Sequence, residues 1–354
     1  MQKKELKEMI YFITKGLQDW KKNNWREVPN SLYRGQQLFI KHAVHSGKVP
    51  NNLFDFIKLL HQPMETWGIP SLSAILPDDA PFLVEDFGMS IDIEDFLEEY
   101  DSPEEFDQSA MKEILRYCRS SNLDEEYRQV RSFVSTPKNA VLTYVQLRTK
   151  MFSIKDSELQ RLLDKCYEQV PHPIGNYRKC PHCGWTVSFV KGKWMCNKEQ
   201  ICKRFRSFEH LEVYNFAEDE VVYRIRPGIQ RYVLLPGMME EILYKSLKSY
   251  DPILYPNIDE FDIRIHVNGK VINLDMKDYR SPKMLANTFN NKPLRELEKY
   301  CENAFIIIPN YRLQIDATYK DLICAALNKE VKKFVRVMTE RELLKRLKEG
   351  NLCQ

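Results

Sequence analysis

Apolar and polar positions follow two different rhythms along the chain. In the first half, apolar residues recur three and four positions apart, which is the period of an amphipathic helix. The clearest segments of this kind are KELKEMIYFITKGLQDWKK, SLYRGQQLFIKHAVHSG, NLFDFIKLLHQ and SELQRLLDKCYEQ. Turn residues separate them. The pattern predicts an all-α region over residues 1–172.

A two-residue rhythm surrounds Asn268 and Gly269, in the segment IDEFDIRIHVNGKVINLDMKD. Asn-Gly between two alternating runs is the strongest short-range signal for a hairpin with a type I′ turn. Counting outward from Val267 opposite Lys270 gives a face that is wholly apolar, which supports this register. Its predicted pairs are Ile265 with Ile272, Ile263 with Leu274, and Phe261 with Met276.

The same register places Asp262 directly opposite Asp275, and Lys277 lies two residues further along that face. Opposed side chains in a hairpin have Cβ atoms roughly 4.5 to 5.5 Å apart. Two ionised carboxylates at about 5 Å repel each other by roughly 3 kcal/mol at an effective dielectric constant near 20. A divalent cation would remove this repulsion, and a lysine beside bound metal suits phosphodiester hydrolysis. The alternative is a hairpin in which the lysine neutralises two surface acids.

The order of the neighbouring segments favours a site. A helix PGMMEEILYKSL precedes the hairpin, and a polar helix around residues 283–302, a buried strand AFIIIPNY, a strand FVRVMT and a helix ERELLKRLKEG follow it. The first helix offers two acids. A helical wheel places Glu240 at the edge of the apolar stripe and Glu241 nearly opposite, so we expect Glu240 to be the acid of the site.

This arrangement resembles the PD-(D/E)xK superfamily, whose fold is restriction-endonuclease-like. The family motif is an Asp on one strand and Asp/Glu-x-Lys on the next, and its positions here are Asp262 and 275–277. Phe261 stands where the family often has Pro. The resemblance begins near Val221 and implies an α/β domain over residues 213–354, with a central mixed β-sheet flanked by helices.

The resemblance also implies an activity, that of a Mg²⁺-dependent DNA endonuclease. Mg²⁺ or Mn²⁺ would be held by Glu240, Asp262, Asp275 and the backbone carbonyl of Met276. Lys277 would position the attacking water or stabilise the transition state. Two other functions stay open, a catalytically inactive zinc-ribbon subunit that binds DNA or recruits a partner, and a nuclease that cleaves RNA.

Two short motifs, CPHCGW and CNKEQIC, bring together Cys180, Cys183, Cys196 and Cys202. Four thiolates in two groups can complete a closed tetrahedral Zn²⁺ site, which is structural rather than catalytic. The alternatives are disulfides or a redox Cys-x-x-Cys. The scattered further cysteines and the lack of a signal-peptide core favour a reducing compartment and therefore zinc. The pattern predicts a small zinc ribbon at residues 176–212.

Basic and aromatic residues interleave in this predicted ribbon. Lysines and arginines suit phosphate contacts and a tryptophan suits base stacking. The alternative is that the aromatic rings pack on the cysteine loops and the basic side chains are simply solvated. The candidates for nucleic-acid contact are Lys191, Lys193, Trp194, Lys203 and Arg204.

Composition narrows the picture further. The chain has 354 residues and a formal net charge of +3, so a surface for DNA has to be a local patch. No apolar run has the length of a membrane span, and a cytoplasmic location is expected. No G-x-x-x-x-G-K-[ST] motif occurs, so any ATP-driven motor would be another protein.

The combination of a helical region, a zinc ribbon and a terminal nuclease-like domain has a narrower resemblance. It is similar to restriction-endonuclease-like defence proteins that are encoded beside a prokaryotic Piwi-type protein and a helicase. That resemblance implies a helicase or Piwi-type partner. Because many such nucleases pair subunits to cut both strands, a homodimer is also expected.

Overall fold

The computed structural model of the chain divides it into two compact units, Met1–Asp101 with Lys277–Gln354 and Ser102–Met276. The domain limits expected from the sequence stay predictions. No helix in the described part of the chain is long and apolar enough to cross a membrane. The structure describes residues 2–77, 81–84, 88–90, 92–93, 96–97, 103–171, 173–190, 192–217, 220–301 and 303–352.

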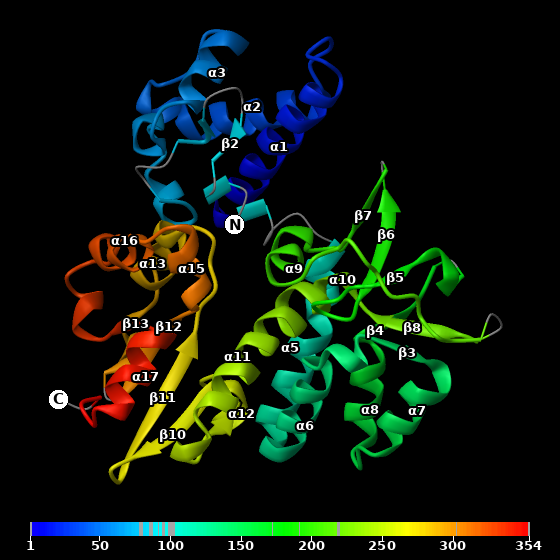
Figure 1. The fold of residues 1–354 in the computed structure, drawn as a ribbon. Helices are drawn as coiled ribbons and strands as arrows, with labels where there is room; N and C mark the ends of the chain where they lie inside the picture. Colours follow the sequence, from blue (N-terminus) through cyan, green and yellow to red (C-terminus); the bar gives the residue numbers. More distant parts are fainter. Residues whose placement is uncertain are drawn as a thin grey trace. The chain divides into compact units, whose positions relative to one another are not determined.

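The amino-terminal part of the first unit is helical. Its helices are α1 (Gln2–Lys22), α2 (Asn30–Ala43) and α3 (Leu53–Leu60), drawn in blue in Figure 1. Helices α1 and α2 cross closely because Gly35 has no side chain: a Cβ there would lie 2.6 Å from the backbone nitrogen of Ile13. The short strands β1 (Leu83–Val84) and β2 (Gly88–Met89) form a separate antiparallel pair.

The carboxy-terminal part of the first unit contains the segments expected after the hairpin. Strand β12 is buried along its whole length and pairs in parallel with β13, as expected for a strand covered on both faces. A reciprocal capping box between Thr339 and Glu342 begins α17. The elements are α13 (Pro282–Asn290), α14 (Leu294–Leu297), β12 (Ala304–Ile308), α15 (Asn310–Ile315), α16 (Tyr319–Ala326), β13 (Val337–Thr339) and α17 (Glu340–Lys348).

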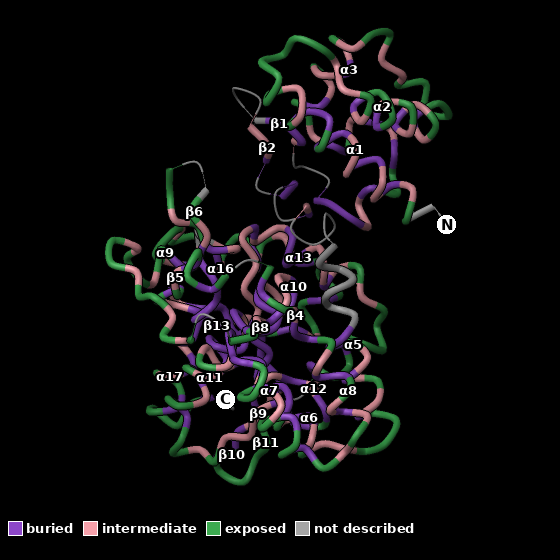
Figure 2. Tube along the Cα trace, turned by 90° about the vertical axis from the view of Figure 1, so that its right-hand side faces the viewer, coloured by how far each residue is buried: buried purple, intermediate pink, exposed green. Residues whose placement is uncertain are grey.

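The second unit contains a three-stranded antiparallel sheet with the order β3-β8-β4. Buried (purple) and exposed (green) stretches alternate along the helices α6 and α8 in Figure 2, as amphipathic helices require. The elements are α5 (Pro103–Ser121), α6 (Asp124–Val134), β3 (Val141–Thr143), α7 (Tyr144–Phe152), α8 (Ser157–Asp164), β4 (Tyr167–Gln169) and β8 (Val222–Ile225).

This sheet corrects the expectation of an all-α first half. Strands β3 and β4 both lie before residue 172, and each pairs with β8, which follows the cysteine segment. Strands of three residues are too short to show an alternating pattern, and their partner is distant in sequence. The helical expectation therefore holds for α1 to α3 and α5 to α8 but not for the whole region.

The cysteine segment packs on this sheet. Trp185 is buried, and its indole nitrogen donates a 2.7 Å hydrogen bond to the carbonyl of Ile225. The four cysteines belong to the same apolar core as α5, α6 and α8. The elements of the segment are β5 (Arg178–Lys179), β6 (Thr186–Val190), β7 (Lys193–Met195) and α9 (Glu199–Phe205).

A continuous helical stretch leads from this core to the hairpin. It consists of α10 (Pro227–Ile229), a π-helical turn η7 (Gln230–Leu234) and α11 (Leu235–Ser246). Strand β9 (Ile253–Leu254) and the turn α12 (Pro256–Asp259) follow.

The predicted hairpin is present as β10 (Ile263–Val267) and β11 (Lys270–Met276), the long yellow arrows of Figure 1. Its register is confirmed, with Val267 opposite Lys270 and Ile263 opposite Leu274. Asn268 and Gly269 have φ angles of 51° and 74°, which are the two left-handed positions of a type I′ turn. Within the second unit, β10 also pairs with β9 in antiparallel fashion, with Ile263 opposite Leu254.

Candidate metal centre and acidic hairpin

The four predicted cysteines form one buried cluster in which every pair of sulfur atoms lies within 4.8 Å. Three of the sulfur–sulfur distances, among Cys183, Cys196 and Cys202, are 3.7 to 3.8 Å. Four sulfur atoms about 2.3 Å from a tetrahedral Zn²⁺ ion are about 3.8 Å apart. The cysteines are unbridged, so the donor set and its spacing fit a structural zinc ion. The prediction that these residues form one metal-type cluster is confirmed.

Gln230 is a part of this centre that the sequence did not reveal. Its side-chain nitrogen Nε2 lies 3.5 Å from Sγ of Cys183 and 3.9 Å from Sγ of Cys196, with the amide donating. Its Oε1 accepts a 3.1 Å hydrogen bond from Nδ2 of Asn197, and the whole residue is buried. Donors of this kind orient thiolates and stabilise their charge. In the sequence, Gln230 is a single glutamine within a helical segment, and nothing in that pattern indicates that it contacts the cysteines.

His182, between the first two cysteines, is not a member of the cluster. Its ring stacks on that of Phe205 at a centroid distance of 4.7 Å. Burial lowers the pKa of His182, which favours the neutral imidazole.

The two hairpin acids lie at the end of the β10–β11 ladder. Beyond the Ile263–Leu274 pair, the Asp262 N–H donates to the carbonyl of Leu274 at 3.1 Å. The carboxylate of Asp262 then accepts a 2.6 Å hydrogen bond at Oδ2 from the N–H of Met276. Asp275, the residue before Met276, is 5 % exposed. The ladder thus delivers the Asp262 carboxylate to the stretch of β11 that carries Asp275.

The two glutamates of α11 face in different directions, as the helical wheel indicates. Glu241 forms a 2.9 Å ion pair with Lys245 on the outer side of the helix. Glu240 is 4 % exposed, and its Oε2 lies 3.4 Å from Nη2 of Arg131. The hydroxyl of Tyr255 also bonds to Glu240.

Arg131 remains a cation in this position. Burial alone would lower the pKa of Arg131, but the Glu240 carboxylate and neighbouring groups raise it above its ordinary value. Glu240 pairs with Arg131, and Asp262 accepts the hydrogen bond from the N–H of Met276. Within the described part of the chain, Glu240, Asp262 and Asp275 do not form a second cluster in which one carboxylate oxygen from each lies within 4.8 Å of the others.

The chain just after Asp275 is fixed by bonds within the first unit. The N–H of Lys277 donates to the carbonyl of Ile307 at 3.0 Å. The carboxylate of Asp278 accepts hydrogen bonds from the Tyr311 hydroxyl and, at 2.7 Å, from Nε of Arg312. Burial, together with the charge of Asp278, raises the pKa of Tyr311. No sequence pattern pointed to Asp278, Tyr311 or Arg312.

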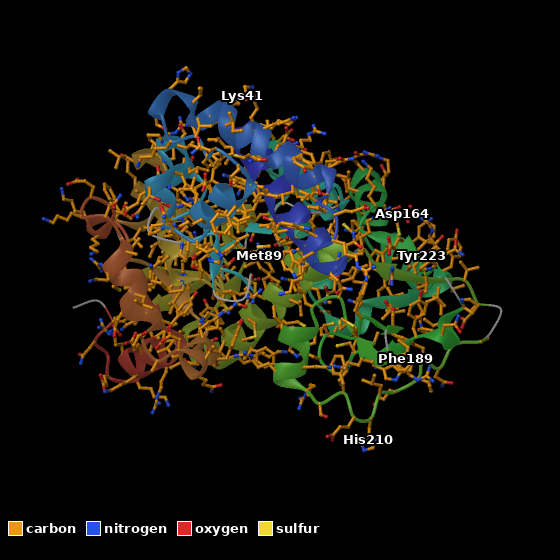
Figure 3. The ribbon with its side chains drawn as sticks, turned by 90° about the horizontal axis from the view of Figure 1, so that it is seen from above. Lys41, Met89, Asp164, Phe189, His210 and Tyr223 are labelled. Atoms are coloured by element: carbon orange, nitrogen blue, oxygen red, sulfur yellow. The ribbon has the colours of Figure 1, made fainter. Side chains whose placement is uncertain are left out.

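Three of the described candidates for nucleic-acid contact are exposed, and Trp194 is half-buried. Phe189, labelled in Figure 3, is 60 % exposed and meets the ring of Trp194 edge to face at 5.1 Å. Lys193, Lys203 and Arg204 are exposed. Lys191 lies outside the described residues.

The acidic hairpin lies in a region of the chain, residues 237–351, that is similar to a known family. Residues 237–351 match the model of a family described as "REase associating with pPIWI_RE". The match covers about a third of the chain and supports a restriction-endonuclease-like domain that is linked with pPIWI-type defence systems. No curated protein and no solved structure matches the chain.

Proposed function

We propose that this protein is a Mg²⁺-dependent DNA endonuclease that acts in prokaryotic defence with a Piwi-type or helicase partner. The observation that carries the proposal is the acidic end of the hairpin, where Oδ2 of Asp262 bonds to the N–H of Met276 next to Asp275. This hairpin lies inside the region that matches the restriction-endonuclease-type family. The description of that family names an association with pPIWI_RE, which supports a Piwi-type partner.

The donor chemistry of the hairpin suits Mg²⁺, which takes carboxylate and carbonyl oxygens and keeps several waters. Asp262, Asp275 and the carbonyl of Met276 would hold the ion, and Glu240 would add a carboxylate from α11. When bound, the ion lowers the pKa of a coordinated water and stabilises charge on the phosphate. Lys277 positions the attacking water or stabilises the negative charge that develops in the transition state.

The cysteine segment would contribute the DNA-contacting surface. Its exposed cations suit phosphate oxygens, and the partly exposed ring pair of Phe189 and Trp194 suits base stacking. The contacts are assigned to Lys191, Lys193, Trp194, Lys203 and Arg204.

The proposal is tested by incubating plasmid, linear DNA and RNA of the same sequence with the zinc-loaded protein and Mg²⁺ or Mn²⁺. The informative variants are Asp275→Ala and Lys277→Ala, with the matched controls Asp251→Ala and Lys270→Ala at exposed positions. We expect the two site variants to lose roughly 10²-fold or more in cleavage rate, while the controls cut like the wild type. Equal cleavage rates for all five proteins reject the roles assigned to Asp275 and Lys277. If the wild type cleaves RNA faster than DNA of the same sequence, the substrate is RNA.

One observation favours a second function, that of a catalytically inactive subunit that binds DNA or recruits a partner. Glu240 is engaged in a buried ion pair with Arg131, and a cation would have to compete with the guanidinium. This function predicts salt-dependent DNA binding that survives Asp262→Ala and Asp275→Ala. It also predicts no cutting with either metal ion, including when the Piwi-type partner is added.

A further inference from the structure

Polar side chains on one face of α6 contact the turn before Asp262 and the carboxylate of Glu240. Asp124, Tyr127, Arg131 and the following Ser135 recur at spacings of three and four residues, so they lie on one side of the helix. Helix α6 lies in the region before the zinc ribbon, outside the residues that match the nuclease family.

The first contact of this face is a strained turn just before Asp262. Tyr255, Asn257, Ile258 and Asp259 all have left-handed backbone conformations, with φ angles of 49°, 53°, 53° and 61°. Such angles are unfavourable for residues with side chains, and most of all for a β-branched residue such as Ile258. They persist only where the surroundings hold them in place.

Helix α6 supplies that restraint, and α12 lies beside it in Figure 1. Oδ1 of Asp124 accepts a 2.7 Å hydrogen bond from the N–H of Ile258. The hydroxyl of Tyr127 donates a 2.6 Å hydrogen bond to Oδ2 of Asp259. The turn also bonds directly to a candidate site residue, because the N–H of Tyr255 donates a 2.9 Å hydrogen bond to the carbonyl of Asp262.

Arg131 joins this turn to the acid of α11. Its Nη2 lies 3.4 Å from Oε2 of Glu240, and its Nη1 donates a 3.0 Å hydrogen bond to the carbonyl of Val233 in η7. Its guanidinium lies 5.0 Å from the centroid of the Tyr255 ring. Arg131 and Glu240 are 6 % and 4 % exposed. A carboxylate buried to this extent needs a counter-charge, and removing one partner of such a pair leaves the other uncompensated.

We propose that α6 is the positioning element of the candidate nuclease site and that Arg131 is its central positioning residue. Arg131 orients the Glu240 carboxylate and holds the Tyr255 end of the strained turn, so that Asp262 stays beside Met276. The inference rests on the proposed nuclease function. The restraint that α6 places on the turn can nevertheless be measured by hydrogen–deuterium exchange, without any cleavage assay. It gives part of the helical first half a role in the nuclease site.

The experiment compares Arg131→Met, Arg131→Lys and Tyr127→Phe with the wild type in the full, zinc-loaded chain. Arg116→Met, which removes an exposed cation from α5, is the matched control. Three quantities are measured: hydrogen–deuterium exchange of peptides covering residues 253–262, Mn²⁺ affinity by calorimetry, and the dependence of cleavage rate on Mg²⁺ concentration. Glu240→Gln is combined with Arg131→Met in a double-mutant cycle.

We expect Arg131→Met to speed exchange in residues 253–262 and to weaken Mn²⁺ binding roughly tenfold or more. Arg131→Lys, which keeps the charge, should recover part of the loss. Tyr127→Phe should speed exchange with a smaller effect on Mn²⁺. In the Glu240→Gln background, Arg131→Met should cost less Mn²⁺ affinity than in the wild type.

The proposal is overturned if Arg131→Met matches Arg116→Met in exchange and in Mn²⁺ affinity. If Arg131→Met does not fold, Tyr127→Phe decides the matter through the same exchange measurement, because it removes a single hydroxyl. A wild type that cuts no nucleic acid rejects the proposed function, while the exchange data still establish or reject the positioning role of α6.

Discussion

The carboxylate of Asp262 accepts a 2.6 Å hydrogen bond at Oδ2 from the N–H of Met276. This bond lies just beyond the last backbone pair of β10 and β11, so the side chain of Asp262 replaces a backbone acceptor. One side chain thus closes the hairpin and brings a negative charge beside Asp275. These two contributions can be separated by substitution, because an amide oxygen can accept the same hydrogen bond without carrying the charge.

We expect Asp262→Asn to keep nearly the wild-type stability and to lose DNA cleavage. Asp262→Ala leaves the Met276 N–H without this acceptor and should lower the free energy of unfolding by about 1 to 3 kcal/mol as well as abolishing cleavage. Denaturant unfolding and plasmid cleavage are measured on the same preparations. If Asp262→Asn cuts DNA like the wild type, the metal-binding role of Asp262 is wrong.

Gln230→Leu should weaken zinc binding by roughly 10- to 100-fold, because it removes the amide that lies 3.5 Å from Sγ of Cys183. Competition with a chromophoric chelator measures the affinity, and Co²⁺ substitution reports the thiolate charge-transfer bands. Gln129→Leu, at an exposed position of α6, is the control. Unchanged zinc affinity in Gln230→Leu would show that the amide does not support the thiolates.

Gly237→Ala should destabilise the protein. A Cβ at this position would overlap with Oγ and Cβ of Ser135, where α11 packs against the end of α6. Overpacking of this kind costs about 1 to 3 kcal/mol. Gly175→Ala meets nothing within 4 Å and should change the unfolding midpoint little. Equal melting curves for the two variants would show that α6 and α11 can move apart to accommodate the methyl group without a loss of stability.

Local chemistry made parts of this structure predictable. The Asn-Gly turn fixed the hairpin register, since both of its residues need left-handed angles and each strand has a period of two. The spacing of the four cysteines indicated one cluster, and the helical wheel separated buried Glu240 from outward-facing Glu241.

The rest depended on contacts between distant segments, which leave no local pattern. Strand β8 pairs with β3 and β4 across the whole cysteine segment. The counter-charge of Glu240 is Arg131, and a buried arginine in an amphipathic helix looks like any other polar position until the two helices are brought together. The same reason hid Gln230, which approaches the sulfur atoms through the fold alone.

Glu340→Gln should change how stability depends on pH. Burial raises the pKa of Glu340 above its ordinary value of 4.5, although its carboxylate accepts a 2.8 Å hydrogen bond from the N–H of Asn310. The folded state therefore binds this proton more tightly than the unfolded state, and the contribution of Glu340 to stability falls as pH rises above 4.5 through the folded pKa.

Glutamine can keep the acceptor oxygen without a titrating proton. The variant should match the wild type at the acidic end of the range and become more stable than it towards neutral pH, as measured by unfolding at several pH values between about 4 and 7. A constant difference between the two proteins over that range would show that Glu340 does not titrate with a raised pKa.

Lys193→Ala and Lys203→Ala should each weaken DNA binding in a way that depends on salt. A lysine that neutralises one phosphate contributes about 0.9 to the slope of log K against log salt concentration for duplex DNA, so each variant should flatten the slope by about that amount. Lys150→Ala, at an exposed position of α7, serves as the control for loss of a surface charge. Trp194→Ala should reduce affinity for single strands by about 1 to 3 kcal/mol without changing the slope, because stacking releases no counterions. Equal slopes for Lys193→Ala, Lys203→Ala and Lys150→Ala would remove the cysteine segment from the DNA interface and leave it a purely structural role.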